Sequence, residues 1–396
     1  ERYLVVLCYY FNNNRKIMKK PYFALVPSGY KLNKIYSILP VDGSGDLTFA
    51  RISESTRVAE NGLIQYTAIG LPTMDWLNSS CPSLLLEPQR TNYAINSSDA
   101  SLWANVGGSQ SITKTQNFSV SPTGEKNATR LEANATGNNY SLIQLSTTSI
   151  TGNYTGSVYL KSNTQNIQNI IVYGRNTAVN SYEIGNEWRR IDLQGSGTTG
   201  QNLFLFIGSF PSNGSDEIID ISVWGGQLEL GDFASSYIPT TNLIATRSAD
   251  LVSPKTLDIN NVRGSVFLDL KASDVGYLSY IKLKGAPYDR IDLVFDSSER
   301  LSINIGNGTA PPFYSYQYIH NQERFRFAVR WNDGTYSVFI NGVNVSNFTT
   351  SSVFSSLNQL AFDNSLGYYN FVGDVYEVGI YNENLTNAEI ITLTTL

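Results

Sequence analysis

The sequence predicts an all-β protein made of two antiparallel β-sandwiches that follow an irregular N-terminal segment. Aromatic residues reach 12%, with 25 Tyr and 18 Phe, and such residues favour strands. Short apolar runs recur between turn residues at intervals of roughly 8–12 residues, which is typical of sandwiches and jelly rolls. A length of 396 residues exceeds what one hydrophobic core usually organises. We therefore expect more than one domain.

Residues 1–90 are interpreted as an N-terminal extension followed by an attachment or assembly segment. Proline and glycine interrupt the chain every few residues from Met18 onward, so this part rarely builds a core of its own. Its strand-like runs, such as 47–52 and 63–69, would have to pair with something else. Because Met18 begins a protein-like run, we expect residues 1–17 to lie upstream of a natural start. The alternative is a strand that is added to a partner's sheet.

Residues 91–240 are expected to form the first sandwich, and residues 241–254 a polar linker. Turn residues such as those at 122–124 and 212–214 separate the strand-like runs of this part. The expected strands cover residues 111–120, 140–147, 154–162, 167–174, 188–195, 202–210 and 218–230.

Residues 255–396 are expected to form the second sandwich. Asp333-Gly334 and Asn341-Gly342 lie between alternating runs and predict two tight hairpins. The final stretch LTNAEIITLTTL predicts a helix, with Thr386 as N-cap and Glu389 completing a capping box. The expected strands cover residues 264–272, 277–285, 290–297, 300–306, 324–333, 336–345, 357–364 and 371–382.

Composition excludes several functions. A net charge of −5, from 28 Lys+Arg against 33 Asp+Glu, provides no basic field for nucleic acid. The apolar run 3–11 is shorter than the ~20 residues of a membrane span. Basic residues follow this run instead of preceding it, so we expect neither membrane insertion nor an export signal. One histidine and two cysteines are too few for zinc clusters. For Cys8 and Cys81 we expect two unrelated thiols, with a disulfide as the alternative.

Two runs carry a family resemblance. CPSLLLEPQRTNYAINSSD (81–99) and VWGGQLELGDFASSYIPTTNLIATRSAD (223–250) resemble the paired signatures that bracket a carbohydrate-binding-module-like sandwich in bacteriophage tail, spike and head-fibre proteins. The preceding FARISESTRVAENGLIQ (49–65) resembles the usual lead-in to that sandwich. The ending at Tyr381-Asn382, followed by 385–393, is similar to concanavalin A-like and laminin-G-like sandwiches. The resemblance implies a phage virion protein whose residues 1–90 attach it to the capsid or tail, and usually a homotrimer.

Sugar binding by β-sandwiches needs an aromatic platform together with amide, carboxylate or backbone groups for the hydroxyls. Trp224 and Trp331 lie in apolar strands and are better explained as core residues. Tyr314, Tyr316 and Tyr318 alternate, and we expect them to form an exposed ladder beside Pro311 and Pro312. The candidate platforms are Trp103, Tyr140, Tyr173, Tyr182, Trp188, Tyr314, Tyr316, Tyr318, Tyr368 and Tyr369.

Structural calcium is a second hypothesis, because both resembled sandwich types often hold an ion through Asp and Asn oxygens. The candidate ligands are Asp216, Asp220 and Asp363, although no EF-hand spacing supports them and an acidic surface turn is the competing interpretation. We expect no other cofactor.

Catalysis is not expected. The nearest carboxylate pairs are Asp289 with Asp292 and Asp374 with Glu377, and a spacing of three places each pair on opposite faces of a strand. His320 has no recognisable partners for a serine triad. A pair contributed by separate strands would escape this reasoning.

These inferences predict a non-enzymatic fibre or spike on the virion surface that binds host surface polysaccharide for attachment. Many weak aromatic and hydrogen-bond contacts would be multiplied by trimeric avidity. One alternative is a depolymerase that cleaves the glycan, and another is a structural decoration of the capsid. No nucleic-acid partner is expected.

Overall fold

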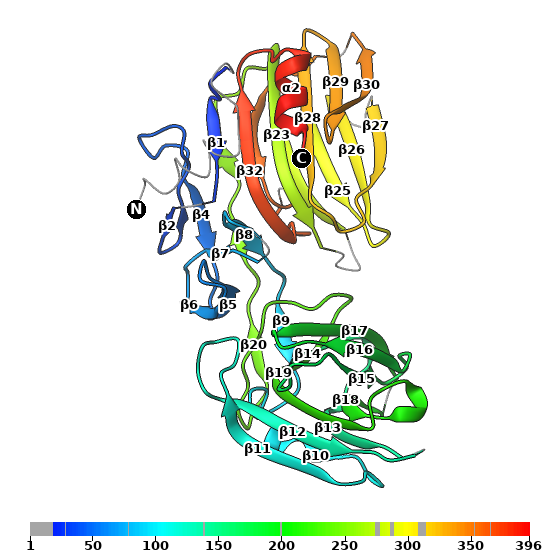
Figure 1. The fold of residues 1–396 in the computed structure, drawn as a ribbon. Helices are drawn as coiled ribbons and strands as arrows, with labels where there is room; N and C mark the ends of the chain where they lie inside the picture. Colours follow the sequence, from blue (N-terminus) through cyan, green and yellow to red (C-terminus); the bar gives the residue numbers. More distant parts are fainter. Residues whose placement is uncertain are drawn as a thin grey trace.

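The computed structural model is nearly all β and contains two antiparallel sandwiches, as the sequence predicts (Figure 1). It describes residues 19–396 except 28, 78, 138, 199, 274–277, 286–288, 308–313, 352 and 365. The expectations for residues 1–17 lie outside the described residues. Within the described part, no helix has the length and apolar character needed to cross a membrane.

The middle sandwich consists of two five-stranded sheets (Figure 1). One sheet has the order β10(Ala104–Asn105), β13(Ser141–Ser149), β18(Asn202–Ser209), β15(Gln168–Gly174), β16(Asn180–Ile184). The other has the order β11(Ile112–Ser119), β12(Ala128–Asn134), β19(Ile218–Leu230), β14(Gly152–Ser162), β17(Arg189–Gly197). Alternating Leu, Ile and Val side chains, such as Leu205, Ile207 and Ile221, meet between the sheets in one buried core. Short 3-10 helices cover Ala100–Leu102 and Pro211–Asn213.

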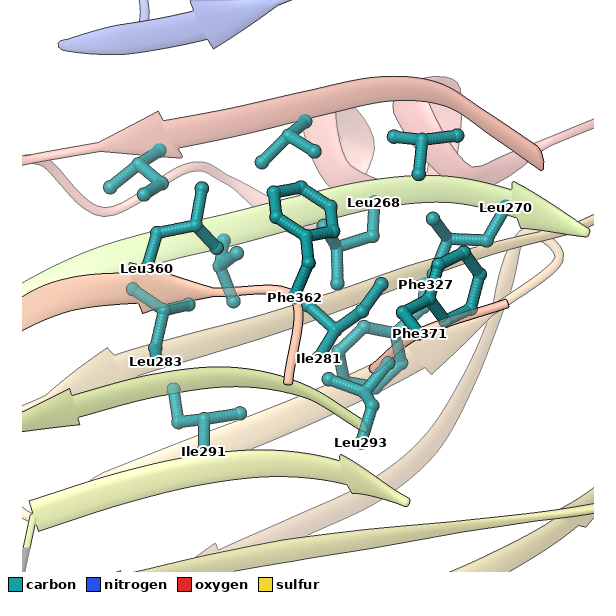
Figure 2. Close-up of a cluster of buried hydrophobic side chains, with 14 of the residues drawn as sticks. Leu268, Leu270, Ile281, Leu283, Ile291, Leu293, Phe327, Leu360, Phe362 and Phe371 are labelled. Atoms are coloured by element: carbon teal, nitrogen blue, oxygen red, sulfur yellow. The ribbon is translucent and has the colours of Figure 1, made fainter. Parts of the chain in front are cut away.

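The C-terminal sandwich pairs a six-stranded with an eight-stranded sheet. The six-stranded sheet has the order β22(Lys255–Thr256), β31(Leu357–Ala361), β24(Ser279–Gly285), β25(Asp289–Phe295), β26(Arg300–Asn307), β27(Tyr314–Ile319). The other sheet has the order β30(Val343–Thr349), β29(Thr335–Ile340), β28(Phe325–Asn332), β23(Arg263–Ala272), β32(Gly373–Tyr381), β8(Ser83–Leu86), β7(Thr73–Asp75), and β1(Phe23–Leu25) pairs with β32. Figure 2 shows side chains of both sheets, such as Leu268 and Ile291, converging in the core.

Local sequence signals of the C-terminal sandwich are confirmed. Asp333 and Gly334 have positive φ between β28 and β29, and Asn341 and Gly342 do so between β29 and β30, as tight hairpins require. The helix α2 (Asn387–Thr394) begins after Thr386, whose side chain and that of Glu389 form the expected capping box. In Figure 1 this helix lies over β23 and β28, and its apolar residues pack on the outer side of the eight-stranded sheet.

Strands of the first segment complete the C-terminal sandwich. Phe23 pairs with Ile380, and Leu86 pairs with Gly373, so β1 and β8 both lie along β32. Phe23 and Leu86 are also buried in the core of that sandwich. A four-stranded sheet of β2(Tyr30–Lys31), β3(Lys34–Ile35), β4(Leu47–Ala50) and β21(Leu251–Val252) joins this segment to the expected linker. The strand-like runs of the segment thus pair with distant parts of the chain, and the attachment role stays a prediction.

A hairpin of the first segment contacts the middle sandwich instead. Its strands are β5(Ser55–Val58) and β6(Ile64–Thr67). The Thr56 hydroxyl donates to the carbonyl of Tyr237 (2.6 Å), and Ile64 packs with Trp224 and Tyr237 in a separate apolar cluster. The expectation that Trp224 and Trp331 are core residues is confirmed by their burial.

Buried charges connect the two sandwiches. Arg247 belongs to β20(Ala245–Arg247), which pairs with β9(Arg90–Asn92). Its Nη1 atom lies 2.6 Å from Oε2 of Glu87 and 3.5 Å from Oδ2 of Asp250. Arg51 lies 2.9 Å from the other oxygen of Asp250, and the backbone N–H of Glu87 also donates to Asp250. All four side chains are nearly inaccessible. Burial raises the pKa of Asp250, against the lowering effect of Arg247 and Arg51. These ion pairs join residues before and after the middle sandwich.

Cys81 is disulfide-bonded, which corrects the expectation of two unrelated thiols. The sequence offered no local signal for this bond, because the two cysteines are widely separated and no spacing motif links them. Cys8 lies outside the described residues.

Candidate functional site

The outer side of one sheet of the middle sandwich carries a row of aromatic rings. Along β18, Leu203, Leu205 and Ile207 face the core and are fully buried. Strand alternation therefore turns Phe204 and Phe206 to the opposite, solvent side, where both are half-buried. The outer sides of sheets in soluble proteins are usually polar. Two phenylalanines there are consequently a feature that the fold alone does not require.

Three rings form a continuous contact on this surface. Phe204 and Phe206 stack at 4.3 Å between ring centroids with planes 19° apart. Tyr173 of β15 meets Phe206 edge to face at 5.0 Å and 82°. The register explains the contact, because Tyr173 and Gln144 are the direct cross-strand neighbours of Phe206 on either side. We call Tyr173, Phe204 and Phe206 the aromatic row.

A second aromatic pair extends the surface beyond the row. Tyr140 contacts Phe210 at 5.6 Å between ring centroids, and the Tyr140 hydroxyl donates to the carbonyl of Gly107. Burial raises the pKa of Tyr173, and the nearby Tyr140 raises it further. This influence indicates that the two phenols lie in one neighbourhood.

Polar groups flank the aromatic row. The amide of Gln144 is half-buried beside Phe206, and Ser146 pairs with Phe204. The guanidinium of Arg175 lies 4.9 Å from the Phe204 ring centroid and donates to the carbonyl of Asn202 (2.7 Å). Flat rings with neighbouring amide, hydroxyl and guanidinium groups can stack on an apolar sugar face and bind its hydroxyls. This surface is the candidate functional site.

Sequence reasoning found part of this site. Tyr140 and Tyr173 are among its candidate platforms, whereas Phe204, Phe206 and Phe210 were assigned only to a strand. The run NLFLFIGSF contains the missed signal, since apolar residues occupy both of its faces. A strand that is apolar on both faces must bury both or expose one.

Trp103 is a core residue. It is 4% exposed, packs in the core of the middle sandwich, and donates its indole N–H to the carbonyl of Asn96 (2.9 Å). A Cβ at Gly226 would lie 2.6 Å from the Trp103 ring, so the glycine leaves the space that the indole fills. This burial corrects the prediction that Trp103 contacts a ligand.

Trp188 lies away from the aromatic row. It packs partly buried against the Trp224 and Tyr237 cluster, and its indole N–H donates to the carbonyl of Val120 (2.9 Å). Lys161 lies over its ring at 5.4 Å. The structure gives Trp188 a packing role beside the β5–β6 hairpin.

Tyr314, Tyr316 and Tyr318 alternate on one side of β27, as expected, but this side faces the interior. All three are partly buried against the core of the C-terminal sandwich. Tyr314 stacks on Phe348 at 4.3 Å with planes 7° apart, and Tyr318 accepts a hydrogen bond from Asn341. The rings close the gap between the two sheets near their edges. The expectation of an exposed ladder was therefore wrong, and the prolines named with it lie outside the described residues.

Tyr368 and Tyr369 are exposed, in the connection before β32. Tyr369 meets Tyr280 at 6.0 Å, on the outer side of the six-stranded sheet. Next to Tyr280 on that side, Asp292 lies 3.4 Å from Lys282 and 3.5 Å from Arg290. Burial raises the pKa of Asp292, while the two cations oppose the shift. This second outer face is thus dominated by charges, and ligand contact by Tyr368 and Tyr369 stays a prediction.

The calcium candidates do not come together. Asp216 accepts from the backbone N–H of Asn169 (2.9 Å), and Asp220 forms a two-point ion pair with Arg130. Within the described ranges, no group of three or more His, Cys, Asp or Glu side chains could hold a metal ion. Asp363 is buried. Its calcium role stays a prediction.

The carboxylates of β32 differ from expectation. Asp269 pairs with Glu377, but the next residue, Leu270, pairs with Val375, so Tyr376 is an extra residue. This bulge puts Asp374 and Glu377 on the same outer side, which corrects their assignment to opposite faces. Asp374 accepts from the Ser83 hydroxyl (2.6 Å), and burial raises its pKa.

His320 and Asp289 belong to other surroundings. His320 is buried against Phe295 and Phe325. Asp289 accepts hydrogen bonds from the backbone N–H groups of Ser355 and Ser356. Asp289 and Asp292 thus hold different partners.

Comparison with known proteins assigns no family. No protein-family model and no curated protein matches the chain. Among solved structures, a carbohydrate-binding module of a Ruminococcus gnavus sialidase, bound to sialyllactose, is 14% identical over 34% of this chain and 83% of its own, with a TM-score of 0.28. Domain 4 of a Geobacillus stearothermophilus arabinanase is 18% identical over 41% and 82%, with a TM-score of 0.30. Likenesses of this size establish neither fold family nor function.

Proposed function

We propose that the chain is a glycan-binding protein and that the aromatic row of the middle sandwich is its binding surface. The observation that carries this proposal is the continuous contact of Tyr173, Phe206 and Phe204 on the outer side of a sheet, next to the amide of Gln144. Rings in such a row stack on successive sugar units, while Gln144 and Arg175 bind hydroxyls. Because stacking tolerates several sugars, we expect weak binding at each site.

The proposal extends to the setting of the protein. The resemblance of 81–99 and 223–250 to phage fibre and spike proteins supports a virion-surface protein that attaches to host polysaccharide as a homotrimer. Trimeric display would convert weak sites into strong attachment. Antibodies against the chain should label phage particles in electron micrographs, and light scattering of the purified protein should give three times the chain mass. Unlabelled particles or a monomer would limit the proposal to glycan binding.

Binding is tested by native electrophoresis in gels that contain soluble polysaccharides, including those extracted from candidate bacterial hosts. We expect retarded migration with at least one polysaccharide. Unchanged migration with every polysaccharide would contradict glycan binding and favour the structural decoration.

Depolymerase activity is the second candidate, and the position of Asp374 and Glu377 on one side of β32 favours it. A pair of carboxylates can hydrolyse a glycosidic bond. Size-exclusion chromatography of the retained polysaccharide after incubation separates the two functions. A shift of the polysaccharide to larger size supports binding alone. Smaller fragments that disappear with Asp374→Asn would establish cleavage.

A further inference from the structure

A pocket of about 190 Å³ lies where the first segment meets the stretch that leaves the middle sandwich. One wall comes from the β5–β6 hairpin and the residues before it, including Glu54, Thr56 and Tyr66. The other comes from Tyr237–Pro239 and Ala245–Arg247. Residues distant in sequence thus build one cavity, and none of them belongs to the aromatic row.

The walls of the pocket combine an aromatic ring, aliphatic surface and hydroxyl groups. The Tyr66 side chain is 61% exposed, so its ring is accessible at the pocket. Ile238 and Pro239 supply aliphatic surface. The hydroxyls of Thr56 and Thr246 are engaged with the Tyr237 carbonyl (2.6 Å) and Thr91 (2.8 Å), but each oxygen keeps acceptor capacity.

The charge around the pocket is negative. Glu54 is exposed on its wall. Burial raises the pKa of Tyr66, and Glu54 and Glu125 raise it further, which shows that both carboxylates act on the phenol. Arg247 offers no compensating charge, because Glu87 and Asp250 already hold its guanidinium. An anionic ligand would therefore be repelled, whereas Glu54 can accept hydrogen bonds from neutral hydroxyls.

The volume selects a small ligand. At ~30 Å³ per water molecule, the pocket has room for about six waters, which is the space of one sugar ring and not of an oligosaccharide. We propose that this pocket is a second carbohydrate site that takes a single neutral sugar ring, the terminal unit of a glycan chain, stacked on Tyr66 with its hydroxyls bound by Glu54. The proposal rests on the proposed function only for the ligand class. It adds recognition of a chain end to recognition of chain interiors by the aromatic row.

The test uses the full chain and saturation-transfer NMR with the methyl glycosides of glucose, galactose, mannose and N-acetylglucosamine, and with glucuronate. A ligand of this size should bind with a Kd on the order of 1 mM. We expect Tyr66→Ala to weaken binding of at least one neutral glycoside by about tenfold. Tyr66→Phe should retain binding, because the ring remains. Phe118→Ala, which removes an exposed aromatic ring that does not line the pocket, is the matched control and should change nothing.

Glu54→Gln separates the charge argument from the stacking argument. It should weaken the neutral glycoside and remove the discrimination against glucuronate. The inference is overturned if no neutral glycoside gives a signal that depends on Tyr66, or if glucuronate binds the unaltered protein as well as the neutral sugars do.

Phe206→Ala keeps this inference distinct from the proposed function. This variant should lose retardation by polysaccharide while its Tyr66-dependent glycoside binding persists. Loss of both signals in Phe206→Ala would place the glycoside on the aromatic row and overturn the pocket site alone. Unchanged retardation in Phe206→Ala would contradict the aromatic row and leave the pocket supported.

Discussion

The two sandwiches differ in how the chain assembles them. Both sheets of the middle sandwich come from one continuous stretch, from β10 at Ala104 to β19 at Leu230. The C-terminal sandwich instead needs three strands from the first segment. Among them is β1, which pairs with β32 although more than 350 residues of sequence separate the two strands. The comparison teaches that β1, β7 and β8 of the first segment are structurally part of the C-terminal sandwich, although composition makes this segment resemble a separate irregular region.

The outer faces of the two sandwiches also differ. The middle sandwich presents the aromatic row on one sheet. In the C-terminal sandwich, α2 covers apolar residues of one sheet, and the other sheet presents Lys282, Arg290 and Asp292. Rings that no helix covers remain available to a ligand. The charges of the C-terminal face are instead paired with one another.

The largest expected effect concerns the separated sandwiches. A fragment of residues 253–396 lacks β1, β7 and β8, so the edge of β32 and part of the apolar core become exposed. We expect this fragment to aggregate or remain without cooperative unfolding, whereas residues 88–250 should unfold cooperatively. Circular dichroism during heating measures both. Cooperative unfolding of 253–396 at the temperature of the full chain would contradict the shared architecture.

The junction between the sandwiches should show the next largest effect. Arg247→Ala leaves the buried carboxylate of Glu87 without its ion-pair partner and leaves Asp250 with Arg51 alone. Breaking a buried ion pair in this way costs about 3–5 kcal/mol. Denaturant unfolding measures this loss, and Arg263→Ala, at an exposed arginine, is the control. A loss equal to that of the control would mean that the network does not stabilise the junction.

A smaller effect is expected in the pH dependence of stability. Burial raises the pKa of Asp75 to about 6, from an ordinary value of 3.8. The folded state therefore binds the proton more tightly than the unfolded state. Protonation of Asp75 stabilises the folded state fully below pH 4, and this stabilisation is lost as the pH rises through about 6. A shift of about two units corresponds to ~3 kcal/mol.

Asp75→Asn should remove this component from the unfolding free energy measured between pH 4 and 7. Glu60→Gln, at an exposed carboxylate, serves as the control and should keep the wild-type profile. Identical pH profiles for Asp75→Asn and the wild type would refute the assignment.

The smallest effect is expected at the helix of the C-terminal sandwich. Thr386→Ala removes the capping box of α2 and should lower the unfolding free energy by about 1 kcal/mol. Thr392→Ala, on the exposed side of the same helix, should cost less. Equal losses would show that helix propensity, and not the cap, determines the effect.

Local signals explain what the sequence predicts well. The Asp333-Gly334 and Asn341-Gly342 turns and the Thr386 cap depend on neighbouring residues, and the structure confirms them. The pairing of Phe23 with Ile380 depends on residues far apart, for which one sequence carries no signal. The bulge at Tyr376 likewise shifts Glu377 to the other face without a local cue.

The candidate site was predicted only in part, for a related reason. Aromatic residues are easy to find, but their exposure is decided by tertiary packing. Trp103 fills the space beside Gly226, whereas Phe204 and Phe206 face outward although their neighbours Leu203 and Leu205 are buried. Alternation along β18 would have separated these two sets once both of its faces were seen to be apolar.

The most direct test of the central claim compares Phe206→Ala with Phe118→Ala in gels that contain the polysaccharide that retards the wild type. Phe118 lies on the other sheet of the same sandwich and is exposed. Phe118→Ala therefore removes the same kind of side chain from the same sandwich, but outside the proposed site. We expect Phe206→Ala to weaken binding by about tenfold, or ~1.4 kcal/mol, with Phe118→Ala unchanged. Equal retardation of both variants and the wild type would contradict glycan binding by the aromatic row.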